Sequence, residues 1–255
     1  MKNRRSLSSA PYPAHPAIQR AVLITGASGG IGRAISVEFA NAGWHIGIHY
    51  HHGKDAAEKT LKQVCEAGGS GSLYQADLRE IQAVHRMVEA FSRHVPVVSV
   101  LICNAGIGGG GLVLRYNDDD WSNVIATNLT GTFHCMKAMG LLLAQRGGSI
   151  VVIGSHAAFH GSVGQAAYAA SKAGLVGLVK TAAQEWGPLN IRVNLLLPGW
   201  HKTRVSQEAI PKADQYTDHA LRRSPSITGV AETVLHLAES TDISGQIWNC
   251  DSRNL

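Results

Sequence analysis

The sequence predicts an α/β fold built on an open, doubly wound parallel sheet. Short apolar segments of strand length alternate along the chain with longer helical patterns. A glycine-rich turn joins the first strand, residues 21–25, to the first helix. A serine follows a later apolar strand directly, at the strand end where open α/β sheets carry their chemistry.

The elements follow from hydrophobic patterning and from turn residues between the apolar runs. Buried-type strands are predicted at residues 21–25, 45–50, 72–75, 98–103, 150–153 and 191–197. Helices are predicted at residues 33–42, 54–67, 79–93, 121–140 and 165–186, the fourth interrupted at residues 128–131. We expect residues 1–20 to be a separate extension and residues 21–255 to form one catalytic domain. Within that domain, residues of about 200–226 are expected to form a polar substrate cap.

Composition excludes several classes of protein. The 255 residues are 45% hydrophobic and 16% charged, as in a globular protein with a sizeable core. No apolar run approaches the ~18 residues of a membrane helix. The first 20 residues hold Lys2, Arg4, Arg5 and Arg20 and no apolar core, so they do not form a secretory signal. They carry four of the five net positive charges, which leaves no basic stripe for nucleic acid on the remainder.

The four cysteines show no CxxC spacing. They are Cys65, Cys103, Cys135 and Cys250. Reduced thiols in a cytoplasmic protein are the simpler interpretation.

Tyr168 and Lys172 stand four residues apart in an Ala- and Leu-rich helical pattern, with Ser155 upstream. Residues at i and i+4 share a helix face. An ammonium near a phenol favours the phenolate, so Lys172 is expected to lower the pKa of Tyr168. Together the three groups suit carbonyl–alcohol interconversion.

The turn after the first strand fits a pyrophosphate site, because its backbone amides and the following helix amino end can face an anion. The segment at 25–32 reads Thr-Gly-Ala-Ser-Gly-Gly-Ile-Gly. Residues 26–30 also match the G-x-S-x-G elbow of serine hydrolases. That alternative is disfavoured, because an elbow needs an oxyanion loop from an earlier strand.

Three histidines, His49, His51 and His52, crowd the end of the second strand. No acidic or thiolate partner is near them in the sequence, so we expect a polar rim over a cofactor and no metal.

The joint pattern resembles the classical short-chain dehydrogenase/reductase family over residues 21 to about 249. The motifs are Thr25-Gly26-x-x-x-Gly30-x-Gly32, Asn104-Ala105-Gly106, Asn128, Ser155, Tyr168-x-x-x-Lys172 and Pro198-Gly199. Within that family the sequence is most similar to bacterial 3-oxoacyl-(acyl carrier protein) reductases. The resemblance implies a single Rossmann-type sheet of about seven strands and a homotetramer.

The resemblance also implies roles for individual residues. Ser155 would hold the substrate oxygen, Tyr168 would act as acid and base, Lys172 would bind the cofactor ribose and tune the tyrosine, and Asn128 would serve a water-mediated proton relay. The residues implied to bind the cofactor are Gly26, Ser28, Gly29, Gly30, Ile31, Gly32, Tyr50, His51, Asp77, Leu78, Asn104, Ala105, Gly106, Tyr168, Lys172, Pro198, Gly199 and Thr203.

The coenzyme is expected to be NADP(H). In Rossmann folds an acidic residue at the end of the second strand binds the adenosine ribose and repels a 2′-phosphate. Tyr50 occupies that position, and His51, His52 and Lys54 follow it as potential donors to a phosphate. The basic residue usual before the second glycine is Gly29, for which Arg33 can substitute.

Three features depart from the family pattern. Residues 225–232 and the carboxyl end lie around the substrate side and the subunit contacts, whereas Cys103 is a small buried-type residue that should not disturb cofactor binding. Cys103 replaces the first Asn of Asn-Asn-Ala-Gly, residues 225–232 lack the usual Gly-Arg-x-Gly-x-Pro-Glu, and the carboxyl end lacks Asp-Gly-Gly. Arg146 matches one basic anchor for a carrier protein, whereas Leu189 stands where a second is expected.

The predicted function is NADP(H)-dependent reduction of a ketone, with a 3-oxoacyl thioester as substrate and acyl carrier protein as a possible partner. Two alternatives stay open: an NAD(P)-dependent dehydrogenase or reductase of another small alcohol or carbonyl, such as a sugar or steroid-like compound, and a catalytically idle nucleotide-binding protein.

Overall fold

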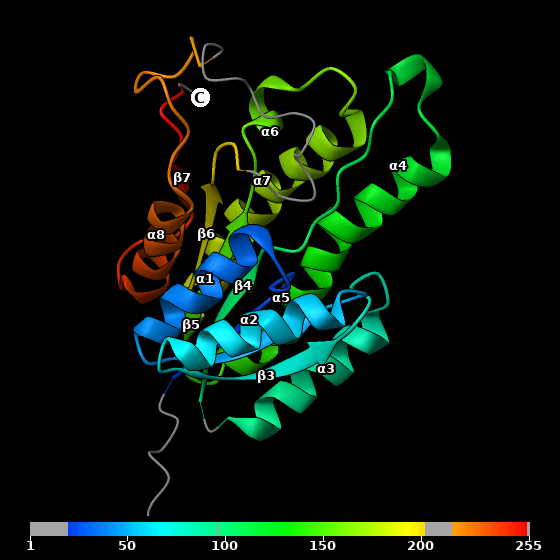
Figure 1. Ribbon diagram of the computed structural model, residues 1–255. Helices are drawn as coiled ribbons and strands as arrows, with labels where there is room; N and C mark the ends of the chain where they lie inside the picture. Colours follow the sequence, from blue (N-terminus) through cyan, green and yellow to red (C-terminus); the bar gives the residue numbers. More distant parts are fainter. Residues whose placement is uncertain (1–19, 96, 202–215, 254–255) are drawn as a thin grey trace, which may run out of the picture.

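A seven-stranded sheet with the strand order β3-β2-β1-β4-β5-β6-β7 forms the centre of the molecule (Figure 1). The computed structural model describes residues 20–95, 97–201 and 216–253. Each neighbouring pair of strands is parallel. The α/β fold class predicted from the sequence is therefore confirmed.

The strands match the predicted segments closely. They are β1 (Ala21–Ile24), β2 (His45–Tyr50), β3 (Ser70–Gln75), β4 (Val98–Cys103), β5 (Gly148–Ile153), β6 (Ile191–Leu197) and β7 (Ile247–Asn249). The short strand β7 was not located in the sequence, because three residues leave too little pattern to detect.

Eight α-helices are found among the described residues. They are α1 (Gly30–Asn41), α2 (Lys54–Glu66), α3 (Ile81–His94), α4 (Asp118–Ile125), α5 (Gly131–Leu143), α6 (Ala157–His160), α7 (Ala166–Trp186) and α8 (Ile227–Glu239). Short 3-10 turns lie at η1 (Val113–Arg115) and η3 (Gly187–Leu189), and a π-helical segment, η2 (Ala126–Thr130), joins α4 to α5. None of these helices is long and apolar enough to cross a membrane.

The predicted helix at 121–140 begins earlier than expected, at Asp118. The side chain of Asn117 caps it by accepting a hydrogen bond from the amide of Asp120 at 2.9 Å. Aspartates at 118–120 in the first turn also complement the positive end of the helix dipole.

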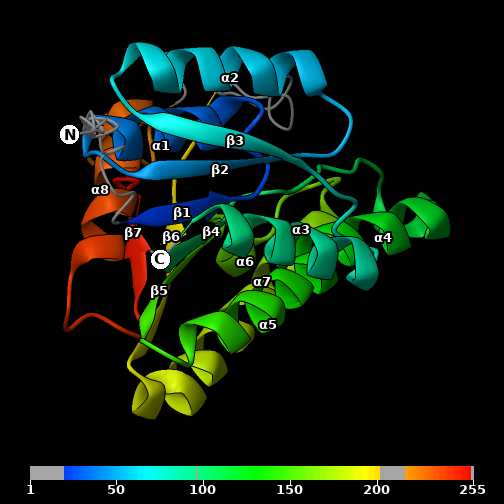
Figure 2. The same ribbon diagram turned by 90° about the horizontal axis from the view of Figure 1, so that it is seen from below.

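The core forms two layers, one on each face of the sheet (Figure 2). Alternate residues of β1 divide between the layers: Leu23 packs with the layer that includes α3, α5 and α7, and Val22 with the layer that includes α1, α2 and α8. This alternation is the period of two expected of a strand buried on both faces.

The strand order reverses at β1 and β4, which lie side by side. Chains leaving the carboxyl ends of these strands turn to opposite faces of the sheet, which opens a crevice between them. The glycine-rich turn follows β1 and the Asn104-Ala105-Gly106 segment follows β4. The topology thus brings two distant motifs to one edge of the sheet.

Candidate active site

Ser155, Tyr168 and Lys172 come together beyond the carboxyl end of β5. Ser155 lies in the loop after β5, and α7 carries Tyr168 and Lys172. The Ser155 side chain hydrogen-bonds the Tyr168 hydroxyl. Lys172 Nζ donates to the carbonyl of Ile153 at 2.7 Å and lies 5.7 Å from the centroid of the Tyr168 ring. A hydroxyl, a phenol and an amine therefore converge on one point.

Burial, and not the neighbouring lysine, has the largest effect on the pKa of Tyr168. Desolvation raises the pKa of Tyr168, although the hydrogen bond with Ser155 lowers it in part. The expectation that Lys172 lowers the tyrosine pKa is therefore wrong for this structure. Burial also lowers the pKa of Lys172 to about 8, which weakens its charge above neutral pH. Tyr168 is consequently held as a protonated phenol.

Asn128 lies in η2, where the helix between α4 and α5 widens. Its Oδ1 accepts a hydrogen bond from the amide of Ile107 at 2.8 Å, and its Nδ2 donates to the Ile107 carbonyl at 2.9 Å. Nδ2 also donates to Ser171 Oγ at 3.1 Å, next to Lys172 in α7. A Cβ added at Gly106 would lie 3.3 Å from Asn128 Oδ1 and 3.8 Å from Lys172 Nζ. The predicted relay residue thus borders the lysine, and π-helical segments are frequent at functional sites.

Reciprocal hydrogen bonds hold the glycine-rich turn against the segment after β4. Thr25 Oγ1 accepts hydrogen bonds from the amides of Asn104 and Ala105, at 2.9 and 3.0 Å. Asn104 Nδ2 donates in return to the carbonyls of Thr25 and Gly26, at 3.0 and 3.1 Å. A Cβ at Gly26 would lie 2.8 Å from the Ala105 Cα, and one at Gly32 2.5 Å from Asn104 Nδ2. Only glycine allows this approach.

The first turn of α1 leaves backbone amides available to an anion. Gly29 precedes the helix and provides no side-chain cap. The amides of the first helical turn, which include those of Gly30, Ile31 and Gly32, have no intrahelical acceptor. Ser28 and Gly29 belong to the same turn, so the residues present fit a dinucleotide phosphate group.

The predicted adenosine side carries a cluster of charged and aromatic groups. Asp77 is paired with Arg79, whose Nε lies 3.0 Å from both carboxylate oxygens, and hydrogen bonding to Arg79 holds the pKa of Asp77 at about 2. His51 Nε2 lies 3.7 Å from Asp77 Oδ2, and its ring stacks on His52 with centroids 3.6 Å apart. Burial lowers the pKa of His51.

The remaining residues predicted near the adenosine are Tyr50, Leu78 and Arg33. Tyr50 and Leu78 are both buried and pack in the two core layers. The Arg33 side chain bridges the glycine-rich turn and α2 by donating to the Ser28 carbonyl at 2.8 Å and to Thr60 Oγ1 at 3.0 Å. Arg33 is therefore positioned next to the turn that the sequence assigned to the cofactor.

The turn after β6 begins with Pro198 and Gly199. Gly199 has a φ of 75°, and a Cβ there would lie 2.8 Å from Pro225 and 3.0 Å from Asp251 Oδ2. This turn therefore packs against the carboxyl-terminal segment. Thr203 and most of the predicted cap lie outside the described residues, as does most of the extension at 1–20.

The three clustered histidines do not act as a unit. His51 and His52 lie at the end of β2, whereas His49 points into the protein and is 2% exposed. No group of three or more potential metal ligands occurs in the described part of the chain. The separate position of His49 was not predicted from the sequence. The strand period gives no signal for this, because it places His49 and His51 on one face and only the end of β2, after Tyr50, separates them.

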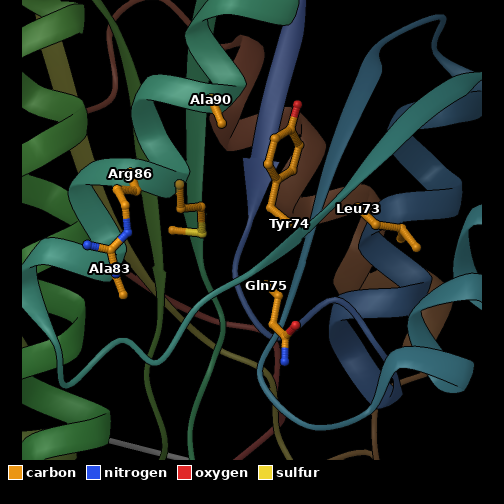
Figure 3. A pocket seen from close by; sticks show the side chains of 7 residues that line it. Leu73, Tyr74, Gln75, Ala83, Arg86 and Ala90 are labelled. Atoms are coloured by element: carbon orange, nitrogen blue, oxygen red, sulfur yellow. The ribbon is translucent and has the colours of Figure 1, made fainter.

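A cavity of about 240 Å³ lies at the edge of the sheet, between β3 and α3 (Figure 3). Leu73, Tyr74 and Gln75 line it from the strand, and Ala83, Arg86, Met87 and Ala90 from the helix. It contains none of the residues predicted for catalysis or cofactor binding. The active site is therefore assigned from the positions of Ser155, Tyr168 and Lys172 and not from this cavity.

Comparison with known proteins identifies the family of this chain. A sequence model described as short chain dehydrogenase matches residues 20–214. The chain belongs to this family. Short-chain dehydrogenases are oxidoreductases that use a nicotinamide coenzyme, so the chain is an oxidoreductase of that kind.

Among its curated relatives, a Staphylococcus epidermidis 3-oxoacyl-[acyl-carrier-protein] reductase FabG is 35% identical over 237 residues, which cover 90% of this chain and 96% of the relative. A Synechocystis 3-oxoacyl-[acyl-carrier-protein] reductase is 34% identical over 90% of this chain and 94% of its own. The resemblance stated from the sequence is confirmed.

Solved structures give the same family fold. A Sinorhizobium meliloti protein assigned as a short-chain alcohol dehydrogenase superposes with a TM-score of 0.86 at 27% identity, covering 92% of this chain and 95% of that chain. An NAD+-bound xylitol dehydrogenase superposes with a TM-score of 0.84 at 27% identity, covering 91% and 98%.

Proposed function

We propose that this short-chain dehydrogenase reduces a ketone to a secondary alcohol with NADPH. The observation that carries the proposal is the convergence of the Ser155 hydroxyl, the partly buried Tyr168 phenol and the buried Lys172 amine beyond β5. A protonated phenol is the group that reduction requires, because the carbonyl oxygen must gain a proton as it becomes a hydroxyl.

In this mechanism Ser155 donates a hydrogen bond to the substrate carbonyl oxygen and fixes its position. When bound, the reduced coenzyme supplies a hydride for the carbonyl carbon. Tyr168 Oη transfers its proton to the carbonyl oxygen as the carbon–oxygen double bond is reduced. Lys172 binds the cofactor ribose and, with Asn128 and a water, returns a proton to Tyr168. Lys172 and Asn128 both border Gly106, which supports this relay.

We infer that the coenzyme occupies the crevice between the turns after β1 and β4. The residues proposed to hold it are those the sequence assigned, from the glycine-rich turn through Tyr50, His51, Asp77, Leu78 and the Asn104–Gly106 segment to the turn after β6. The fit rests on the uncapped first turn of α1 and on two glycines whose Cβ atoms would collide with the segment after β4.

The preference for NADPH over NADH is part of the proposal. Tyr50 provides no negative charge to repel a 2′-phosphate, and His51, His52, Lys54 and Arg33 lie on the elements around that position. Burial lowers the pKa of His51, so the cationic side chains of Arg33 and Lys54 contribute most of the attraction. A ratio of kcat/KM for NADPH to NADH above one is expected, and a ratio at or below one contradicts this assignment.

A 3-oxoacyl thioester is the proposed substrate, with acyl carrier protein as the partner. The names of the curated relatives support it. An apolar rim near the site also supports it: Leu112, Val113, Leu114 and Val163 are 58%, 77%, 99% and 91% exposed. The Gly111 amide donates to the Gly164 carbonyl at 3.0 Å, so both parts of the rim lie together and can cover an acyl chain. Exposed Arg146 can contact an acidic carrier.

Oxidation of a small polyol with NAD+ is the second candidate, favoured by the structural similarity to the xylitol dehydrogenase. Purified protein should be assayed with acetoacetyl-coenzyme A and NADPH, by the loss of reduced nicotinamide absorbance, and in parallel with xylitol and NAD+. Faster turnover of the thioester supports the reductase. Turnover of xylitol alone supports the second candidate, and no turnover with coenzyme bound supports an idle nucleotide-binding protein.

We also propose that the protein is cytoplasmic and forms a homotetramer. It is not expected to bind nucleic acid or a membrane.

A further inference from the structure

His49 occupies the junction of three parallel strands. It lies one residue before the end of β2, with β1 on one side of that strand and β3 on the other. Its Nδ1 lies 3.0 Å from the Gly26 amide, and its Nε2 lies 3.1 Å from the Ala76 carbonyl. One imidazole ring therefore joins the turn after β1 to the segment after β3.

The two contacts fix the tautomer of the ring. A backbone amide can only donate, so Nδ1 carries the lone pair that accepts from Gly26. A backbone carbonyl can only accept, so Nε2 carries the proton that is donated to Ala76. A doubly protonated ring would lose the bond to Gly26. Burial favours the neutral form, since it lowers the pKa of His49 to about 4.

Both partners of His49 stand beside residues assigned to the coenzyme. Gly26 opens the glycine-rich turn with a φ of 63°, and Ala76 directly precedes Asp77. The His49 carbonyl also accepts the amide of Ala27 at 2.9 Å. His49 thus binds two successive amides of the turn and leaves the later amides free to face a phosphate.

We propose that His49 is a positioning residue that holds the diphosphate end and the adenosine end of the coenzyme site in register. This inference rests on the proposed coenzyme site. Without the ring, the Gly26 amide and the Ala76 carbonyl would each lack a buried partner. The two loops could then shift independently, so a dinucleotide that spans them would lose affinity.

The chain offers a matched control on the same strand. His45 is also buried, at the opposite end of β2, where its Nδ1 lies 2.9 Å from Ser70 Oγ. His45→Leu and His49→Leu remove the same ring from the same strand. A loss of coenzyme affinity confined to His49→Leu therefore reflects position and not the loss of a buried histidine in general.

The first test is NADPH affinity, measured by the fluorescence of the reduced nicotinamide on titration. We expect His49→Leu to raise Kd about tenfold or more, equivalent to ~1.4 kcal/mol, because the coenzyme must then order the two loops that it spans. His45→Leu should leave Kd within about twofold, by the same conversion. His49→Asn keeps an acceptor close to the Nδ1 position and should recover part of the affinity. At saturating coenzyme, kcat and the KM for the ketone should not change.

A second test uses the unaltered protein, in case the variants fold poorly. Nitrogen-15 NMR of the histidine rings should show His49 with Nδ1 unprotonated and Nε2 protonated, and NADPH should shift its resonances but not those of His45. The opposite tautomer, or a wild-type Kd in His49→Leu, overturns the inference. If Gly32→Val also binds NADPH normally, the proposed coenzyme site itself is wrong, which is a different failure.

Discussion

At the scale of single residues, the environment of Tyr168 decides whether its phenol keeps its proton near neutral pH. The sequence shows a phenol and an ammonium one helical turn apart, which by itself predicts a lowered tyrosine pKa. The structure buries Lys172 and partly buries Tyr168, and desolvation raises the pKa of Tyr168 instead. A phenol that keeps its proton acts as an acid, which suits reduction of a carbonyl.

Replacing Tyr168 by phenylalanine tests the proposed acid. We expect Tyr168→Phe to lower kcat about 10²-fold or more, the range for loss of a positioned proton donor, with NADPH affinity and melting temperature nearly unchanged. Tyr74→Phe is the control, because it removes a phenolic hydroxyl that bonds His94 at the sheet edge. Near-normal turnover in Tyr168→Phe would rule out the mechanism.

The protonation of His49 predicts a pH dependence of stability. Its pKa is lowered from 6.5 to about 4 on folding, so the unfolded chain takes up the proton first as the pH falls. The contribution is complete above pH 6.5, declines as the pH falls toward 4, and then levels off. The total loss is on the order of 3 kcal/mol.

Urea unfolding at a series of pH values measures this loss. The amide of His49→Asn does not titrate, so the variant should show a flatter dependence than the wild type between pH 6.5 and 4. Parallel curves for the two proteins would show that His49 is not the titrating group.

At the scale of elements, the glycine-rich turn and α1 are defined by their contact with the segment after β4. Gly32 faces Asn104 Nδ2 and the Gly26 carbonyl, and a Cβ there would lie 2.5 Å from each. The sequence motif identifies these glycines, but only the structure shows which atoms they approach.

Gly32→Val is therefore expected to displace Asn104, to destabilise the fold and to weaken NADPH binding by more than about tenfold, equivalent to ~1.4 kcal/mol. Gly187→Ala at the end of α7 is the contrasting change, since a Cβ there meets nothing within 4 Å and the backbone of Gly187 is helical. Alanine favours helix over glycine, so unfolding should cost up to about 1 kcal/mol more. Thermal melts and fluorescence titrations of both variants check the pair. Unchanged coenzyme affinity in Gly32→Val would contradict the proposed site.

The junction of α4 and α5 shows how an element adapts to one side chain. The sequence shows an interruption around Asn128, and the structure places a π-helical segment there. The wider turn accompanies an Asn128 that is fully buried, with both ends of its amide bonded to the Ile107 backbone. Single π-helical turns within α-helices are frequent at functional sites, which agrees with the position of Asn128 beside Lys172.

At the scale of the whole molecule, we expect a symmetric oligomer. The face of α7 with Ala169, Ala173, Val176 and Lys180 carries small residues that permit close helix approach. Phe133 and Leu141 of α5 are also 44% and 68% exposed, which leaves apolar surface for a partner.

Light scattering at micromolar concentration should give a mass near four times the 27.1 kDa of the chain. Ala173→Glu introduces a charge at the centre of that face and is expected to dissociate the assembly, because an unpaired charge in a two-fold contact meets its own copy. A wild-type mass of one chain, or an unchanged mass in the variant, would refute this interface.

The sequence alone determined the fold class, the order of most strands and helices, and the family, because periodicity and motif spacing are local properties of the chain. It also identified Ser155, Tyr168 and Lys172 as a group. It did not locate α8, whose apolar residues form one side of a core layer, nor α6, which is a single short turn. Short or mixed patterns of this kind acquire their structure from packing.

Only the tertiary structure decided the protonation of Tyr168 and the hydrogen-bond partners of His49. Both depend on burial and on partners far away in the chain, such as the Gly26 amide 23 residues before His49 and the Ala76 carbonyl 27 residues after it. Desolvation and long-range hydrogen bonds arise when the sheet assembles, so no local pattern around His49 or Tyr168 could reveal them.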